Sequence, residues 1–237
     1  MDKEALYDSY HLDRDSATLQ SIRFTHERMN YSLEKAIPAV LKELKSEARV
    51  LDIGCGNGRF ALFCQGLGLS NYLGVDLSAG QVEIAGKLYA EYEFRQADAL
   101  EYLKTTGERF DLIHMSHVME HFPFDEGLEI MRLLKERLNP GAIIINEMPN
   151  ADAYFNAPSA RYIDVTHERL YNPVSFAQLL TTAGFDRFDH FNYYIGSNVL
   201  LHALHRVTIR LFEIVLRIMG FEPQPIYTSS MITVIRA

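Results

Sequence analysis

The chain has 237 residues and a hydrophobic content of 48%, which suffices for one domain with a full core. Its net charge of -8 disfavours nucleic-acid binding, because phosphate contacts need clustered lysine and arginine. The two cysteines, Cys55 and Cys64, are too few for a disulfide framework and favour a reducing compartment. A polar N-terminus without a signal-like segment, and the lack of a long uncharged apolar run, predict a cytoplasmic protein without a spanning helix.

The first part of the chain alternates between strand and helix patterns. Apolar residues at helical spacing predict a helix over 15–46, broken near Pro38, within an N-terminal helical cap at 1–47. Five short apolar strands then alternate with helices, which indicates a parallel sheet with helices on both faces. The predicted strands are 49–53, 71–78, 92–99, 109–116 and 141–150. The helices between them are 58–68, 78–90, 99–106 and 124–141, the second capped by Ser78 and the last closed by Asn-Pro-Gly.

The rhythm changes after residue 150. A long loop is expected over 151–172, followed by a helix that Asn172 caps and Pro173 begins. A strand over 187–195, a long amphipathic helix over 198–219 and a last strand over 226–237 complete the chain. We expect a single domain, in which a cofactor-binding core at 48–150 is followed by a substrate-side region at 151–237.

A glycine-rich turn directly follows the first strand. Gly54, Gly56 and Gly58 form G-x-G-x-G, whereas the dinucleotide fingerprint would need a glycine at Arg59, and no P-loop lysine follows. Glycines at such places let the backbone approach a ligand closely. Since ligands of parallel sheets bind at the carboxyl ends of the strands, the turn predicts a small-molecule site there.

Carboxylates follow the first three strands. Asp52 can bond an amine, Asp76 can accept both hydroxyls of a ribose, and Asp98 can bond an adenine amino group. With these residues, "VLDIGCGNG", "GVDLS", "QADAL" and "FDLIHMSHVMEHF" resemble the class I S-adenosylmethionine-dependent methyltransferases over about 48–150. The resemblance implies an α/β, Rossmann-like three-layer sandwich, whose seven-stranded, mostly parallel sheet has an antiparallel last strand.

The same resemblance implies S-adenosyl-L-methionine as the cofactor and assigns its contacts along the strand ends. Asp52, Gly54, Cys55, Gly56 and Gly58 flank the methionine part; Asp76 holds the ribose; Leu77, Asp98 and Ala99 surround the adenine; Met115 and Ser116 lie near the sulfonium.

"HVMEH" follows the fourth strand and is literally the H-x-x-E-H pattern of one class of zinc peptidases, in which His117 and His121 would share a helix face. Its place after a strand of a nucleotide-type sheet, with no obvious third ligand, argues against that use. We interpret His121 as a structural histidine bonded to backbone, and His117 as a candidate general base near the methyl group.

A second cluster lies in "DVTHER". Asp164, Thr166, His167 and Arg169 resemble a D-x-T-H-x-R loop of methyltransferases from surface-polysaccharide and other glycan pathways. His167 beside Asp164 can remove a proton from an acceptor hydroxyl, and Arg169 can hold an anionic group. Alternatively, Asp164 and Arg169 pair with each other and fix the loop. No metal site is assigned, although Glu147, Asp164 and His121 could supply ligands if they converge.

The helix expected at 198–219 carries a polar stripe and is otherwise apolar. It suits three roles: a cover for the sheet edge or pocket, a homodimer contact, or a peripheral membrane contact near a lipid-linked acceptor. The stripe comprises His202, Arg206, Arg210, Glu213 and Arg217.

These observations predict a methyltransferase that uses S-adenosylmethionine on a small-molecule or glycan acceptor, foremost a sugar hydroxyl or a phosphate oxygen. The rival acceptor is a quinone-like apolar small molecule, which the Tyr- and Phe-rich segment 154–194 would tolerate. A cofactor-binding module without catalysis is the alternative from a different class, and the negative charge argues against an RNA acceptor.

Overall fold

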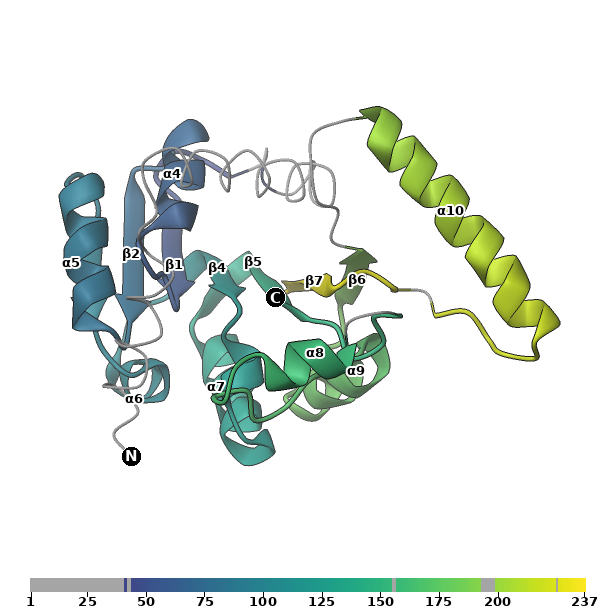
Figure 1. Cartoon of the computed structure of the whole chain (residues 1–237). Helices are drawn as coiled ribbons and strands as arrows, with labels where there is room; N and C mark the ends of the chain where they lie inside the picture. The colour runs from purple at the N-terminus through teal and green to yellow at the C-terminus, as the bar shows by residue number, and fades with distance from the viewer. Residues whose placement is uncertain (1–40, 42–43, 155–156, 193–198, 225) are drawn as a thin grey trace.

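A computed structural model describes residues 41, 44–154, 157–192, 199–224 and 226–237. Seven strands form one sheet in the order β3-β2-β1-β4-β5-β7-β6 (Figure 1). They are β1 (Arg49–Ile53), β2 (Asn71–Asp76), β3 (Glu93–Gln96), β4 (Phe110–Ser116), β5 (Leu138–Pro149), β6 (Phe188–Asn192) and β7 (Ser230–Arg236). The first five run parallel to one another, and β7 is antiparallel to both β5 and β6. The predicted fold class is therefore confirmed, including the antiparallel last strand.

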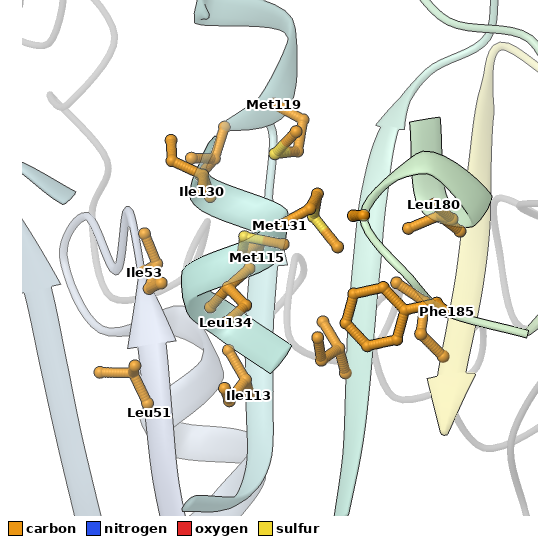
Figure 2. Packing of buried hydrophobic residues seen from close by; sticks show 14 of the residues in the cluster. Leu51, Ile53, Ile113, Met115, Met119, Ile130, Met131, Leu134, Leu180 and Phe185 are labelled. Atoms are coloured by element: carbon orange, nitrogen blue, oxygen red, sulfur yellow. The ribbon is translucent and has the colours of Figure 1, made fainter. Parts of the chain in front are cut away.

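Alternation along the buried strands gives each sheet face its own apolar layer. Leu51, Ile53, Ile113 and Met115 point to the face covered by α6 (Ala99–Thr105), α7 (Phe124–Glu136) and α9 (Pro173–Thr182), as Figure 2 shows in part. Val50, Leu112, Ile143 and Ile145 point to the other face, where α4 (Arg59–Gly66) packs through Phe60 and Phe63. The sheet is therefore the middle of three layers, which leaves its carboxyl edge as the place for a ligand.

Several helices begin where the sequence places a cap. Ser78 accepts from the N–H of Gln81 at 3.3 Å at the start of α5 (Ala79–Leu88). Asn172 accepts from the N–H of Ser175 at 2.8 Å, the Ser175 hydroxyl accepts from the N–H of Asn172, and Pro173 occupies the first turn of α9. Both predicted caps are confirmed, and each satisfies backbone donors that a helix start leaves open.

Two predictions around β5 and the following loop were wrong. Asn139, Pro140 and Gly141 do not close α7, because β5 already begins at Leu138 and pairs with Phe110, with a register shift before Leu112. The expected loop at 151–172 contains a short helix, α8 (Ala157–Tyr162). The N-terminal helix expected over 15–46 falls almost wholly outside the described residues, as do 193–195 of the predicted strand.

The predicted amphipathic helix is α10 (Val199–Ile218), which stands apart from the sheet beyond β6 in Figure 1. Its Phe212 ring meets Tyr154 edge-on at 5.1 Å, and Ile209 is buried. Much of its apolar surface is exposed, so α10 is not simply a cover for the sheet. The exposed side chains are Leu204, Val207, Leu211, Ile214, Val215 and Ile218. None of the helices in the described ranges is long and apolar enough to cross a membrane.

The close approach of the first turn to the segment after β4 makes Gly54 a test of the fold. Gly54 and Gly68 have nearly equal φ values, 69° and 72°. A Cβ on Gly54 would lie 2.4 Å from Cγ2 of Val118, whereas one on Gly68 would have nothing within 4 Å.

Gly54→Ala should therefore lower the free energy of unfolding by about 1–3 kcal/mol more than Gly68→Ala, because overpacking adds to a backbone cost that the two share. Urea denaturation without ligand measures both variants. Equal losses in the two would contradict this packing.

Candidate functional site

The three glycines of the first turn all adopt left-handed conformations, with φ of 69° at Gly54, 51° at Gly56 and 84° at Gly58. Residues with a side chain rarely adopt these φ angles, so the glycines stand at positions where the backbone conformation requires them. The N–H of Gly56 donates to Oδ2 of Asp76 at 2.8 Å, and the N–H of Ser78 donates to Oδ1 at 2.9 Å. The carboxylate at the end of β2 thus fastens the glycine turn to the start of α5 and lies at the carboxyl edge of the sheet.

Asp52 lies behind this turn, in the layer packed by α4. Its Oδ1 is 2.7 Å from Nδ1 of His114, its Oδ2 accepts from the Tyr72 hydroxyl at 2.6 Å, and 1% of the residue is exposed. The ring of Phe60 stacks on His114 at 3.7 Å. The sequence assigned Asp52 to an amine of the ligand, whereas the structure gives each of its oxygens a buried protein partner. Burial and the Asp52 charge raise the pKa of Tyr72, which keeps that hydroxyl a hydrogen-bond donor.

The predicted adenine edge lies at the carboxyl ends of β2 and β3. Asp98 is exposed and caps α6, its Oδ1 accepting from the N–H of Glu101 at 3.0 Å. Leu77 and Ala99 are half-buried; Leu77 lies just before the start of α5, and Ala99 is the first residue of α6. The N–H of Ala97 donates to the carbonyl of Asp76 at 2.9 Å, so the two strand ends are joined directly.

The other residues predicted to contact the methyl donor, S-adenosylmethionine, differ in the groups that they can present to it. Cys55 is buried, and burial raises the pKa of its thiol well above the usual range, which makes it an unreactive apolar group. Met115 is fully buried among Ile53, Met131 and Leu134, so only its backbone can face a ligand (Figure 2). Ser116, half-buried at the end of β4, is the side chain that can reach the edge.

His117 follows β4 in a left-handed conformation with φ of 56°, unusual for a residue other than glycine. Its Nδ1 is 3.0 Å from Oε1 of Glu120, and its Nε2 is 3.5 Å from Oε1 of Glu147. Half of the His117 side chain is exposed. Desolvation of the ring nitrogens alone would lower the pKa of His117, but the carboxylates of Glu120 and Glu147 outweigh it and raise the pKa to about 10. An imidazolium has no lone pair to accept a proton, so this raised pKa argues against the general-base role predicted for His117.

The H-x-x-E-H pattern does not form the helix that a zinc peptidase needs. Only Met119–His121 is helical, as the short 3₁₀ helix η1, and His117 lies before it. His121 instead turns toward the 164–169 loop, where its Nδ1 lies 2.8 Å from the Thr166 hydroxyl and 3.4 Å from the Thr166 carbonyl. The backbone contact predicted for His121 is present, although the shorter partner is a side chain.

The D-x-T-H-x-R loop is organised differently from either sequence interpretation. Asp164 accepts at Oδ1 from the Thr166 hydroxyl at 2.6 Å and from the Thr166 N–H at 2.8 Å, so it supports His121 through Thr166 and not His167. His167 is oriented from α8, its Nδ1 lying 2.7 Å from the Ala160 carbonyl. In the described part of the chain Asp164 and Arg169 form no ion pair with each other; the Arg169 guanidinium lies 5.6 Å over the Phe124 ring.

The structure therefore brings His121 and His167 together, with ring centroids 4.9 Å apart. Sequence reasoning missed the Ala160 carbonyl, the Glu120 carboxylate and the Tyr72–His114 support of Asp52. A signal existed for the last pair, because Tyr72 and His114 are polar interruptions in otherwise apolar strands. For Glu120 the signal was the H-x-x-E-H pattern itself, whereas no local pattern indicates the Ala160 carbonyl.

Comparisons with known proteins agree with this geometry. Residues 25–188 match a family described as a methyltransferase domain. A ubiquinone biosynthesis O-methyltransferase of Dinoroseobacter shibae is 29% identical over 68% of this chain and 71% of its own length. One of Azorhizobium caulinodans is 37% identical over 44% of this chain, and only 41% of its own length is covered.

Among solved structures, an S-adenosylmethionine-dependent methyltransferase of Archaeoglobus fulgidus is 26% identical with a TM-score of 0.66, covering 90% of this chain and 94% of that one. A phosphoethanolamine N-methyltransferase of Haemonchus contortus, crystallised with S-adenosyl-L-methionine, is 17% identical with a TM-score of 0.59. The alignment spans 95% of this chain and 59% of that one, and it shows a shared fold.

His117 gives the pH test of the site. Because its folded pKa is raised to about 10, above an ordinary value near 6.5, its ion pairs make their full contribution to stability below about pH 6.5. Half of the side chain is exposed, so solvent screening makes that contribution small. That contribution is lost as the pH rises toward 10. We expect the wild-type protein to exceed His117→Asn in unfolding free energy at pH 7, with a difference that shrinks steadily up to pH 10.

Asparagine suits this comparison because it tolerates the left-handed backbone. Urea denaturation across the pH range gives the difference, and side-chain NMR of His117 gives its pKa directly. A difference that stays constant, together with a titration near pH 6.5, would contradict the assignment.

Proposed function

Since the chain belongs to the methyltransferase-domain family and uses S-adenosylmethionine, we propose that it methylates a hydroxyl oxygen of an apolar, quinol-like small molecule. Two features support this acceptor. The relatives from Dinoroseobacter shibae and Azorhizobium caulinodans, 29% and 37% identical over the aligned parts, are named ubiquinone biosynthesis O-methyltransferases. The exposed apolar side of α10 offers a surface on which an apolar acceptor or the membrane holding it can rest.

The observation that carries the proposal is the state of His167. Its Nδ1 contacts a carbonyl oxygen, which can only accept, so Nδ1 holds a ring hydrogen and the lone pair of the neutral ring is on Nε2. His121 is held next to it by the Thr166 hydroxyl. A hydroxyl acceptor must lose a proton during methyl transfer. In the proposed site, the imidazole nitrogens of His121 and His167 are the bases that can accept it.

On the donor side we assign the ribose to Asp76 and the adenine edge to Leu77, Asp98 and Ala99. The backbone of Gly54, Cys55, Gly56 and Gly58 borders the methionine part, and the Met115 backbone and Ser116 lie near the sulfonium. The positive φ values of the glycines and the bonds from Asp76 to the turn support this arrangement. Asp52 keeps the turn in place from behind and is assigned no direct contact.

The chemistry asks the protein mainly for alignment. The acceptor oxygen forms a bond to the methyl carbon while the carbon–sulfur bond breaks, the sulfonium becomes a neutral thioether, and the hydroxyl proton leaves at the histidine pair. Holding oxygen, carbon and sulfur in line can lower the barrier by about 7–11 kcal/mol. Assistance with the proton adds a factor of about 10² to 10⁴.

A sugar hydroxyl is the second candidate acceptor. It is favoured by the D-x-T-H-x-R loop, whose Asp164, Thr166 and His167 lie together beside Glu120. The two candidates separate in one assay, in which labelled S-adenosylmethionine is offered with a hydroquinone or catechol series and with nucleotide sugars. Transfer to the sugars alone would replace the first candidate by the second.

His167→Ala tests the assignment of the proton site. We expect the methylation rate to fall by about 10²- to 10⁴-fold, while the affinity for S-adenosylmethionine, measured by calorimetry, stays within a factor of about two. His190→Ala is the matched control, because His190 lies on β6 with its Nδ1 bonded to Thr233 and should leave the rate unchanged. An unaltered rate in His167→Ala would remove the histidine pair from the reaction.

A further inference from the structure

One carboxylate oxygen of Glu120 and one nitrogen each of His121 and His167 lie within 4.8 Å of one another. Two imidazoles and one carboxylate form a ligand set that several divalent transition metals use. We propose that Glu120, His121 and His167 bind a divalent cation of the Zn²⁺ type, with the acceptor hydroxyl as a further ligand. The ligand set stands on these contacts alone, whereas its part in catalysis rests on the proposed function.

Glu120 is the first argument for a cation. The residue is 1% exposed, its Oε1 lies 3.0 Å from Nδ1 of His117, and its Oε2 is buried without a hydrogen-bond partner among the described residues. A buried carboxylate oxygen without a partner is costly, and such groups in native proteins usually indicate a missing ligand, ion or water. A cation between Glu120 and the two imidazoles would supply that partner.

The hydrogen bonds of the imidazoles are the second argument. His167 donates from Nδ1 to the Ala160 carbonyl at 2.7 Å, which leaves the lone pair on Nε2. His121 has its Nδ1 2.8 Å from the Thr166 hydroxyl, and that hydroxyl donates its own hydrogen to Asp164 at 2.6 Å. The hydroxyl therefore accepts from His121, whose ring hydrogen is likewise on Nδ1, so that both rings carry the lone pair on Nε2.

This is the arrangement of ligands in protein metal sites, where each metal-binding imidazole donates its other N–H to a carbonyl, hydroxyl or carboxylate. All three residues follow it: Ala160 orients His167, the Thr166–Asp164 pair orients His121, and His117 holds the second oxygen of Glu120. The main chain holds the ligands together, since the Glu120 carbonyl accepts from the N–H groups of Glu168 and Arg169 at 2.8 and 3.1 Å. Each proposed ligand is therefore oriented by a hydrogen bond to a group that does not itself bind the cation.

The donor set also selects the metal. Nitrogen ligands suit Zn²⁺, Fe²⁺ or Co²⁺ better than Mg²⁺ or Ca²⁺, which prefer oxygen. Three protein ligands leave coordination positions open, as in catalytic sites. With the cation bound, the Nε2 lone pairs of His121 and His167 are used for coordination, so the cation would take over the role assigned above to the histidine pair. An acceptor hydroxyl bound there would lose its proton to water more readily, because the cation stabilises the oxyanion that attacks the methyl group.

The proposed ligands differ from those that the sequence suggested. Of Glu147, Asp164 and His121, only His121 belongs to the cluster. Glu147 lies against His117. Asp164 accepts a hydrogen bond from the Thr166 hydroxyl, which in turn contacts His121.

Titration with Co²⁺, without donor or acceptor, tests the site in the full chain. Wild-type protein dialysed against chelator should bind about one equivalent and show visible d–d absorption, which Zn²⁺ abolishes by displacement. Glu120→Gln and His167→Ala should weaken binding by about 100-fold or more. The matched controls Glu136→Gln, an exposed carboxylate at the end of α7, and His190→Ala should bind as wild type does.

Glu120→Gln keeps an oxygen for His117 and leaves the backbone contacts of residue 120 in place, so it decides the question if His167→Ala does not fold. No d–d bands in the wild type, or equal affinity in variants and controls, would overturn the proposal. Because the titration needs no turnover, it separates the two ideas: methylation without metal binding overturns only the metal site, and metal binding without methylation contradicts only the proposed function.

Discussion

The site depends on the burial of Glu120 at the point where the chain leaves β4. A carboxylate that is 1% exposed must be compensated, and His117 does so at Oε1, whereas Oε2 has no hydrogen-bond partner among the described residues. Its Oε1 meets His117, which also lies near Glu147, and its carbonyl receives two N–H groups from the 164–169 loop. Glu120 therefore joins the strand ends assigned to the methyl donor to the loop assigned to the acceptor.

The donor half is built by a different constraint, the need for a backbone that a ligand can approach. Three glycines with positive φ follow β1, and Asp76 fastens their turn to the end of β2. Behind the turn, Asp52, Tyr72 and His114 form a buried hydrogen-bonded set packed by Phe60. Such a preorganised turn keeps its shape before the cofactor binds, which reduces the ordering cost of binding.

Sequence reasoning reached the fold because it follows from local patterns, and the proposed donor edge rests on patterns of the same kind. The alternation of apolar strands and capped helices gives the layers, and the glycine spacing with Asp76 and Asp98 marks the strand ends. The pairing of β5 from Leu138 could not be predicted, since Asn-Pro-Gly is also how a helix ends. α8 was missed because its six residues carry no cap signal and no apolar stripe.

The acceptor half was the least predictable part, because its groups meet only through tertiary contacts. The sequence placed His167 beside Asp164, as neighbours in one loop, yet Ala160 orients His167 and Asp164 acts on His121 through Thr166. His117 was expected to be a base, but Glu147 on β5, far along the chain, lies 3.5 Å from its Nε2 and helps to raise its pKa. Charges brought together by the sheet decide such roles, and no spacing within one segment reveals them.

The central claim is that one nucleoside–amino-acid molecule fills the carboxyl edge of this sheet, with its sulfur directed toward the histidine pair. A crystal structure with S-adenosylhomocysteine tests it most directly. The account predicts the ribose hydroxyls on Asp76, the adenine beside Asp98 and the sulfur between Ser116 and the 164–169 loop. A ligand seated elsewhere, or a sulfur directed away from His121 and His167, would contradict it.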